Sequence, residues 1–139
     1  MAIGYITRIE RFSSAHRLNV PQLSKKENFE IFGKCNHING HGHNYTLKVT
    51  VKGTIDPVTG MIVNISDLKA WIKEDVLQHL DHKNIDLDVE YFHSKASTAE
   101  NLTVFIWETL SPRFKGIDAK LYEIELYETD LNIARYKGE

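Results

Sequence analysis

Cysteine and long apolar runs are both scarce in this sequence, and each absence narrows the class of protein. The single cysteine, Cys35, excludes a disulfide within the chain and is typical of a reducing compartment. No apolar run reaches the roughly 20 residues that a membrane-spanning helix needs. No signal peptide is evident, because Met1 leads almost directly into an alternating strand. We therefore expect a cytoplasmic protein.

An excess of charge of one sign is also lacking. The formal net charge of −2 at pH 7 argues against a broad nucleic-acid-binding surface. An anionic small molecule would need a local cluster of Lys and Arg, because the chain as a whole does not attract it. The sequence contains no linker, repeat or low-complexity stretch, so we expect residues 1–139 to form a single domain.

Periodicity predicts an α+β fold. Alternation of apolar and polar residues predicts four strands, over residues 3–17, 43–55, 119–128 and 132–137. A shift of phase near residues 11–14 predicts a bulge or a bend in the first strand before His16. Helical spacing predicts two helices: one over about 67–80 with Ser66 as N-cap, and one ending near Leu110 that opens on a capping box over Ser97–Glu100. We expect an antiparallel four-stranded sheet with two helices on one face, and free edges that another subunit could cover.

The strand over 43–55 is preceded by a His-Gly-His motif. His41 and His43 are two residues apart, so on a strand both point to the face that Tyr45 and Leu47 identify as the core side. Neutral imidazoles that bind a metal suit that face better than charged ones. His16, at the end of the first strand, would complete a three-histidine zinc site with an open position, as in catalytic zinc centres. A pair of solvated or hydrogen-bonded histidines is the alternative reading.

Three further residues carry reactive groups. Cys35 lies in a polar, Gly-flanked loop beside Lys34 and could act as a thiolate base, as a nucleophile, as a fourth metal ligand or not at all. Asp81 follows the first helix, where a carboxylate faces the negative end of the helix dipole, and it could hold the imidazole of His82 in one tautomer. A polar turn after the helix is the alternative.

Glu128 ends the third predicted strand on its apolar face. Ile124 and Leu126 share its parity, so the carboxylate would be buried and would need a partner. A ligand with paired N–H donors could supply one through two parallel hydrogen bonds. If the strand frays after Leu126, Glu128 is simply solvated.

Taken together, the motifs resemble the 6-pyruvoyl-tetrahydropterin synthase family, animal type, over nearly the whole chain. The segments that carry the resemblance are Phe12–Leu18, Gly33–Tyr45, Leu80–Asn84, Ser97–Leu102, Tyr127–Asn132 and Tyr136–Glu139. The resemblance implies the T-fold, in which subunits join their sheets into a barrel, usually as a homohexamer that is a dimer of trimers. It also implies the zinc-dependent conversion of 7,8-dihydroneopterin triphosphate to 6-pyruvoyl-tetrahydropterin, with elimination of triphosphate, in tetrahydrobiopterin biosynthesis.

The same resemblance assigns roles to residues of this chain. By position, the family's zinc ligands, one ion per subunit, correspond to His16, His41 and His43. The proton-transfer residues correspond to Cys35, Asp81 and His82. The substrate-binding residues correspond to Glu128 for the pterin, to Thr98 and Glu100 for another part of the pocket, and to Arg8 for the triphosphate. Mg²⁺ is associated with the family's activity and would accompany the triphosphate.

Three rival readings share part of this pattern. In the bacterial 6-carboxytetrahydropterin synthases the cysteine typically lies closer to the His-Gly-His; here five residues separate Cys35 from His41, which favours the pyruvoyl enzyme. A non-catalytic pterin- or metal-binding module would not need every proton-transfer residue. A zinc hydrolase unrelated to pterins would leave Glu128 without a role.

Overall fold

The computed structural model describes residues 1–139, and its long strands come in two pairs separated in sequence by the main helices. The strands are β1 (Ile3–His16), β2 (His41–Thr54), β3 (Lys83–Asn84), β4 (Lys120–Tyr127) and β5 (Ile133–Tyr136). The α-helices are α1 (Lys25–Phe32), α2 (Ile65–Ile72), α3 (Gln78–Leu80), α4 (Ile85–Asp88) and α5 (Ala99–Leu110). Short 3₁₀ helices are η1 (Gly33–Asn36), η3 (Glu90–His93) and η4 (Ser111–Phe114), and η2 (Lys73–Leu77) is a π-helical turn.

The strands form one sheet in the order β3-β1-β2-β4-β5. The four long strands pair antiparallel, as the sequence predicts. The fifth strand, β3, is an addition: it runs parallel to β1 and pairs only with Ser14 and Ala15. Two residues are too few to produce a periodic pattern, which is why the sequence predicts four strands rather than five.

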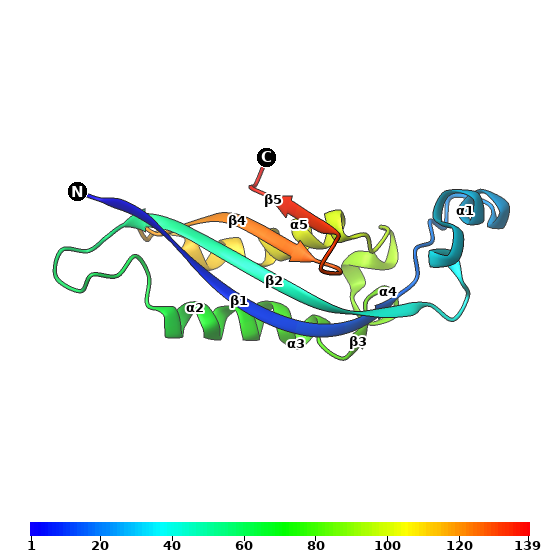
Figure 1. Cartoon of the computed structure of the whole chain (residues 1–139), viewed down its shortest axis with the longest axis horizontal. Coiled ribbons are helices and arrows are strands. Elements are labelled where there is room, and N and C mark those ends of the chain that lie inside the picture. The colour runs from blue at the N-terminus through cyan, green and yellow to red at the C-terminus, as the bar shows by residue number, and fades with distance from the viewer.

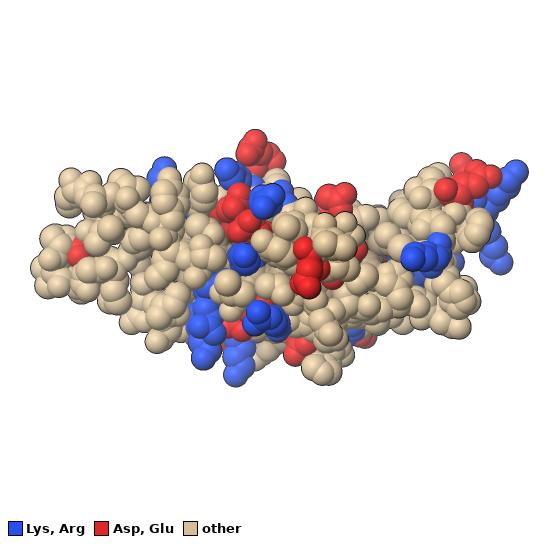
Figure 2. Space-filling model, viewed as in Figure 1, with Lys and Arg blue, Asp and Glu red and all other residues tan.

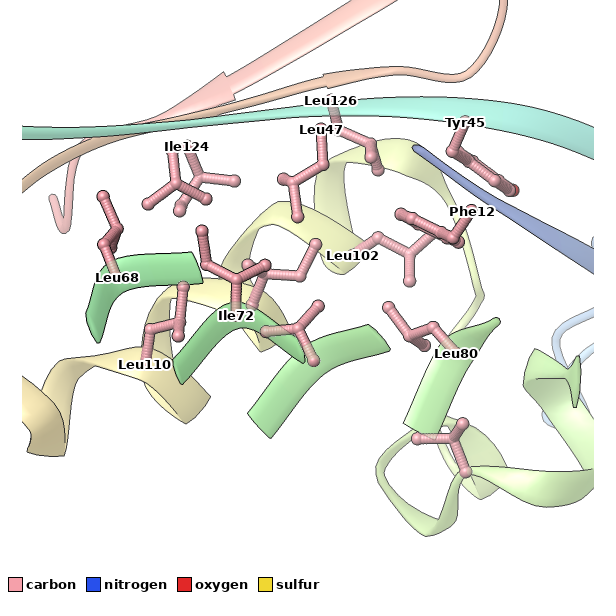
Figure 3. Packing of buried hydrophobic residues seen from close by; sticks show 14 of the residues in the cluster. Phe12, Tyr45, Leu47, Leu68, Ile72, Leu80, Leu102, Leu110, Ile124 and Leu126 are labelled. Atoms are coloured by element: carbon pink, nitrogen blue, oxygen red, sulfur yellow. The ribbon is translucent and has the colours of Figure 1, made fainter. Parts of the chain in front are cut away.

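The helices cover one face of the sheet and leave the other face open (Figure 1). The core lies between the sheet and the helices α2 and α5, where Leu68, Leu102 and Ile106 are fully buried (Figure 3). On β2, Tyr45 and Leu47 are also fully buried, so the predicted core side of this strand is confirmed. Side-chain packing therefore holds the start of β2, with its His-Gly-His motif, against the helical layer.

The predicted bulge in β1 is wrong, because the register between β1 and β2 runs unbroken from Ile3 opposite Thr54 to His16 opposite His41. The apolar residues of β1 lie on two faces. Tyr5 is on the open face and 54% exposed, whereas Phe12 and His16 point into the core. A change of apolar face along one regular strand looks like a phase shift in the sequence.

Both predicted helix caps are displaced. The side chain of Asn64, not Ser66, caps α2 by accepting a hydrogen bond from the Ser66 N–H at 2.9 Å. Thr98, not Ser97, caps α5 by accepting from the Asn101 N–H at 3.2 Å, so Glu100 is not the partner in a capping box. The one-residue shift leaves Ser97 fully buried ahead of the helix.

The outer edge of β1 carries main-chain groups that β2 does not use. The Ser13 N–H donates to Asp81 Oδ1 at 2.9 Å, and the Ser13 carbonyl accepts from the His82 N–H at 2.6 Å. Because main-chain groups alternate along a strand, Ile9 and Arg11 direct theirs to the same edge.

Acidic and basic side chains are intermixed on the face shown in Figure 2, without a continuous basic surface. No helix has the length and apolar content to cross a bilayer.

Candidate metal centre and active site

Three histidines meet where the end of β1 pairs with the start of β2. His16 lies opposite His41, and His43 follows on the same face. One ligand atom from each ring lies within 4.8 Å of the others, and Nε2 of His16 is 3.1 Å from Nε2 of His41. A tetrahedral zinc ion with bonds of about 2.0–2.1 Å holds its nitrogens roughly 3.3 Å apart, so small ring rotations suffice to bind one ion.

The ring of His16 is oriented by a residue far away in the sequence. Its Nδ1 lies 2.8 Å from the main-chain oxygen of Ser97, and both residues are fully buried. A carbonyl oxygen only accepts, so in the neutral ring Nδ1 carries the hydrogen and Nε2 is left with a free lone pair.

Gly40 allows the tight turn into His41: its φ is +72°, and a Cβ there would lie 2.8 Å from the His16 oxygen.

The donor set fits a zinc ion. Nε2 of His43 is buried and has no hydrogen-bond partner in the chain, which a bound cation would remedy. Burial lowers the pKa of both His41 and His43; the neighbouring His16 adds to this, and the Glu128 carboxylate opposes it without reversing it. Both shifts favour the neutral ring, the form that binds a metal. Three imidazole ligands would leave one position of a tetrahedral site open for a substrate.

Glu128 lies beside this cluster. It follows β4 directly, and its main-chain N–H donates to the Asn132 oxygen at 3.1 Å, which holds it in the turn to β5. Its Oε1 is 3.9 Å from Nε2 of His43, and its side chain is only 20% exposed. A mostly buried carboxylate with no cationic side chain bonded to it can accept N–H groups from a ligand.

Asp81 and His82 are fixed on the outer edge of β1. Asp81 Oδ1 accepts from the Ser13 N–H at 2.9 Å and lies 3.0 Å from Nδ1 of His82. The Ser13 N–H and then His82 hold the pKa of Asp81 below its usual range, which offsets its unfavourable place after a helix. His82 has a positive φ of 60°, and its side chain is 82% exposed. The imidazole of His82 is oriented by Asp81 and is accessible to a ligand or another protein chain at this edge of the sheet.

Cys35 is held through its main chain. In η1, its carbonyl accepts from the Leu18 N–H at 3.0 Å. The next residue, Asn36, donates through Nδ2 to the Leu18 oxygen at 2.8 Å, and its own oxygen accepts from Nε of Arg17 at 2.9 Å. The loop is thus clamped onto the segment that follows His16. No hydrogen bond joins the half-buried thiol to the Asp81–His82 pair within one chain.

The comparisons with known proteins cover the whole chain. A family model described as 6-pyruvoyl tetrahydropterin synthase matches residues 5–139. The chain belongs to the 6-pyruvoyl tetrahydropterin synthase family. It is 54% identical over 138 residues to the 6-pyruvoyl tetrahydrobiopterin synthase of Poecilia reticulata, covering 99% of this chain and 92% of that protein. It is 51% identical over 135 residues to the Homo sapiens protein of the same name, covering 96% and 91%.

The fold is that of the family. The solved structure of the Caenorhabditis elegans 6-pyruvoyl tetrahydropterin synthase superimposes with a TM-score of 0.95 at 43% identity, covering 100% of this chain and 98% of that one. The prediction of a T-fold is confirmed. The sheet of one chain is open, as expected for a synthase of this family whose barrel forms from several subunits.

The other residues that the family resemblance singles out lie in different surroundings. Thr98 caps α5 next to the buried Ser97, so the start of this helix is adjacent to His16, and Glu100 is exposed in its first turn. Arg8 lies farther along β1, and Nη2 is 2.8 Å from Oε1 of Glu10. This ion pair partly neutralises the charge that would attract a triphosphate.

Two residues of the site have no counterpart in the sequence predictions for this synthase. Ser97 acts through its carbonyl, which any residue carries, so only its place in the Ser97–Glu100 segment could have drawn attention to it. Asp86 accepts from the Arg17 N–H at 2.7 Å and acts electrostatically on His41. It also lines a cavity of about 390 Å³ with Gly40, the residue before His41. An aspartate inside a short helix gives no sequence signal for either property.

Proposed function

We propose that this chain is a 6-pyruvoyl-tetrahydropterin synthase that uses one zinc ion per subunit. The substrate is 7,8-dihydroneopterin triphosphate, and the products are 6-pyruvoyl-tetrahydropterin and triphosphate. The observation that carries the proposal is the cluster of His16, His41 and His43 with Glu128 beside it, in a chain that matches curated synthases over almost its full length.

The protein's own groups divide the work. The three histidines hold the zinc, which when bound supplies Lewis acidity to the hydroxyl groups of the substrate side chain. Glu128 accepts hydrogen bonds from the exocyclic amine and a ring N–H of the pterin, which fixes its orientation. Its position 3.9 Å from His43 supports this role, because the reacting side chain is then directed at the histidine cluster.

Proton transfer is assigned to groups on two sides of the substrate. Cys35, as a thiolate, takes a proton from a side-chain carbon, and His82, oriented by Asp81, carries out a second transfer. Hydrogen moves from the side chain to the pterin ring, so no redox cofactor is needed. The triphosphate leaves from the carbon next to the one that loses its proton, and Mg²⁺ accompanies its phosphates.

A homohexamer built as a dimer of trimers is part of the proposal. Most of the outer edge of β1 has no neighbouring strand, because β3 pairs only with Ser14 and Ala15, and the imidazole of His82 is exposed; both support a site completed by a neighbouring subunit. Such an arrangement would bring His82 of one subunit to the substrate held by Cys35 and Glu128 of another. The proposal also places a single functional domain over residues 1–139 in the cytoplasm, where the lone Cys35 would stay reduced.

Product analysis tests the proposal. Zinc-loaded protein is incubated with 7,8-dihydroneopterin triphosphate and Mg²⁺, and the products are identified by mass spectrometry. We expect 6-pyruvoyl-tetrahydropterin and triphosphate in equal amounts. Release of acetaldehyde would instead identify 6-carboxytetrahydropterin synthase activity. Tight pterin binding without turnover would indicate a binding module, and neither binding nor turnover would refute the proposal.

A further inference from the structure

Tyr45 carries a buried hydroxyl group that the chain itself does not satisfy. The residue is 0% exposed, and its Oη has no hydrogen-bond partner. A buried hydroxyl without a partner destabilises a protein, so native structures rarely leave one. Phenylalanine would fill the same space without this penalty. We therefore expect the hydroxyl to form its hydrogen bond with a partner that is not part of the chain.

The ring of Tyr45 is held in place and lies next to the histidine cluster. It stacks on Phe12, its cross-strand neighbour, with ring centroids 4.8 Å apart and planes 11° from parallel (Figure 3). Its centroid is 5.6 Å from that of His43 and 6.5 Å from that of His16. Tyr45 follows His43 by two residues on β2, and Phe12 and His16 lie on the neighbouring strand β1. All four rings therefore share one face of the sheet. Stacking prevents the ring from turning to another partner.

The surroundings also determine what the hydroxyl can do. The hydroxyl is a phenol, which can both donate and accept a hydrogen bond. With an ordinary pKa of about 10, a phenol carries a hydrogen to donate at neutral pH. A partner that fits is a neutral or anionic oxygen of a ligand held beside His16 and His43, the rings nearest to Tyr45 in the cluster.

We propose that Tyr45 is a substrate-binding residue, and that its hydroxyl donates a hydrogen bond to a hydroxyl oxygen of the substrate side chain next to His16 and His43. This inference rests on the proposed function, because the pterin carries the hydroxylated side chain to this point. Glu128 then recognises the pterin ring, and Tyr45 recognises the side chain.

The test compares Tyr45→Phe with a matched control, Tyr122→Phe. The Tyr122 hydroxyl lies 3.5 Å from Nζ of Lys137, and its ring packs against Tyr5 on the open face of the sheet. Both changes are made in a Cys35→Ala background, so that the bound substrate is not consumed. Calorimetry then measures the Kd of 7,8-dihydroneopterin triphosphate and of 6-methyl-7,8-dihydropterin, which lacks the side-chain hydroxyls.

We expect Tyr45→Phe to weaken binding of the triphosphate substrate roughly tenfold, the usual worth of one hydrogen bond to a neutral donor. Binding of the methyl analogue should be unchanged, and the control should change neither Kd. In urea titrations without zinc or substrate, Tyr45→Phe should be at least as stable as the parent, because it removes an unsatisfied group.

Each other outcome is decisive. Equal affinity of parent and Tyr45→Phe for the substrate, or equal weakening for both ligands, overturns the inference. Loss of stability or failure to fold in Tyr45→Phe shows that the hydroxyl is structural and overturns it as well. If the Cys35→Ala parent binds neither ligand, the proposed function fails and takes this inference with it. The proposed function stands if the Cys35→Ala parent binds the substrate and the added change Glu128→Gln weakens that binding. With these two results, a negative result for Tyr45→Phe counts against the inference about Tyr45 alone.

Discussion

The Nδ1 atom of His16 lies 2.8 Å from the main-chain oxygen of Ser97. This bond joins the end of β1 to the residue just ahead of α5, across 81 positions of sequence. It orients one imidazole while the β1–β2 pairing positions the other two. A hydrogen bond from the second ring nitrogen to a main-chain oxygen fixes the ring and the tautomer of a metal-binding histidine.

Loss of any one of the three imidazoles should prevent stable zinc binding. His16→Ala leaves two ligands, and we expect the zinc content to fall from about one ion per chain to a small fraction of that. Inductively coupled plasma mass spectrometry of dialysed protein measures the zinc content. His79→Ala, an exposed change on α3, is the control and should keep its zinc. Full zinc content in His16→Ala would show that the site lies elsewhere.

Glu128→Gln should weaken pterin binding while leaving the metal in place. The substitution keeps the size of the side chain but removes the charge that strengthens hydrogen bonds from the pterin. Hydrogen bonds to charged groups contribute about 1.5–3 kcal/mol, so Kd should rise roughly 10- to 100-fold. Calorimetry with 6-methyl-7,8-dihydropterin measures the change. Glu125→Gln, which breaks an ion pair with Arg135, is the matched control; an equal effect of both would contradict a specific role for Glu128.

Cys35→Ala should separate chemistry from binding. Without the thiol as proton acceptor, we expect product formation to fall roughly 10²- to 10⁴-fold, the usual contribution of general acid–base catalysis. The Kd of the substrate should change little, because the thiol is not assigned to holding it. Unchanged turnover, measured by mass spectrometry of the product, would remove Cys35 from the mechanism.

Asp81 should contribute a pH-dependent part of the stability. Its pKa is lower in the folded chain than in the unfolded chain, since the Ser13 N–H and His82 favour the carboxylate. The contribution is therefore present above the ordinary carboxyl pKa of about 4 and is lost as the pH falls through the lowered value. Asp81→Asn should be less stable than the parent at pH 6–7, and the difference should shrink below about pH 4.

Urea titrations at a series of pH values measure this difference. Glu108→Gln, which removes one exposed carboxylate from α5, is the control. A difference between Asp81→Asn and the parent that stays constant from pH 7 to about pH 3 would mean that the charge of Asp81 plays no part.

Much of the fold could be predicted because it follows from period-two and helical patterns. On β2, the parity of Tyr45 and Leu47 correctly identified the core side. On β1, the same reasoning failed because Tyr5 and Phe12 put apolar rings on opposite faces, and the open face reads as apolar too. A pattern reports which residues share a face, but it cannot tell an interior from a surface that another subunit could cover.

The candidate site was predictable only where side chains carry it. The motif with His41 and His43 predicts a candidate metal-binding face, and the parity of Glu128 places this residue on the same side. The carbonyl of Ser97 and the unsatisfied hydroxyl of Tyr45 could not be found this way. Both depend on which atoms meet after the chain has folded, and not on the kind of residue.

The bond from His16 to Ser97 also has a consequence for synthesis on the ribosome. All three imidazoles belong to the first 43 residues, but β4, which borders β2, begins only at Lys120. A nascent chain exposes all three histidines of the candidate metal site long before Ser97 and the core helix behind it have left the exit tunnel. Early metal capture would then hold a β-hairpin whose apolar face is still uncovered, so timely release of the C-terminal half governs how long that hairpin is open to aggregation.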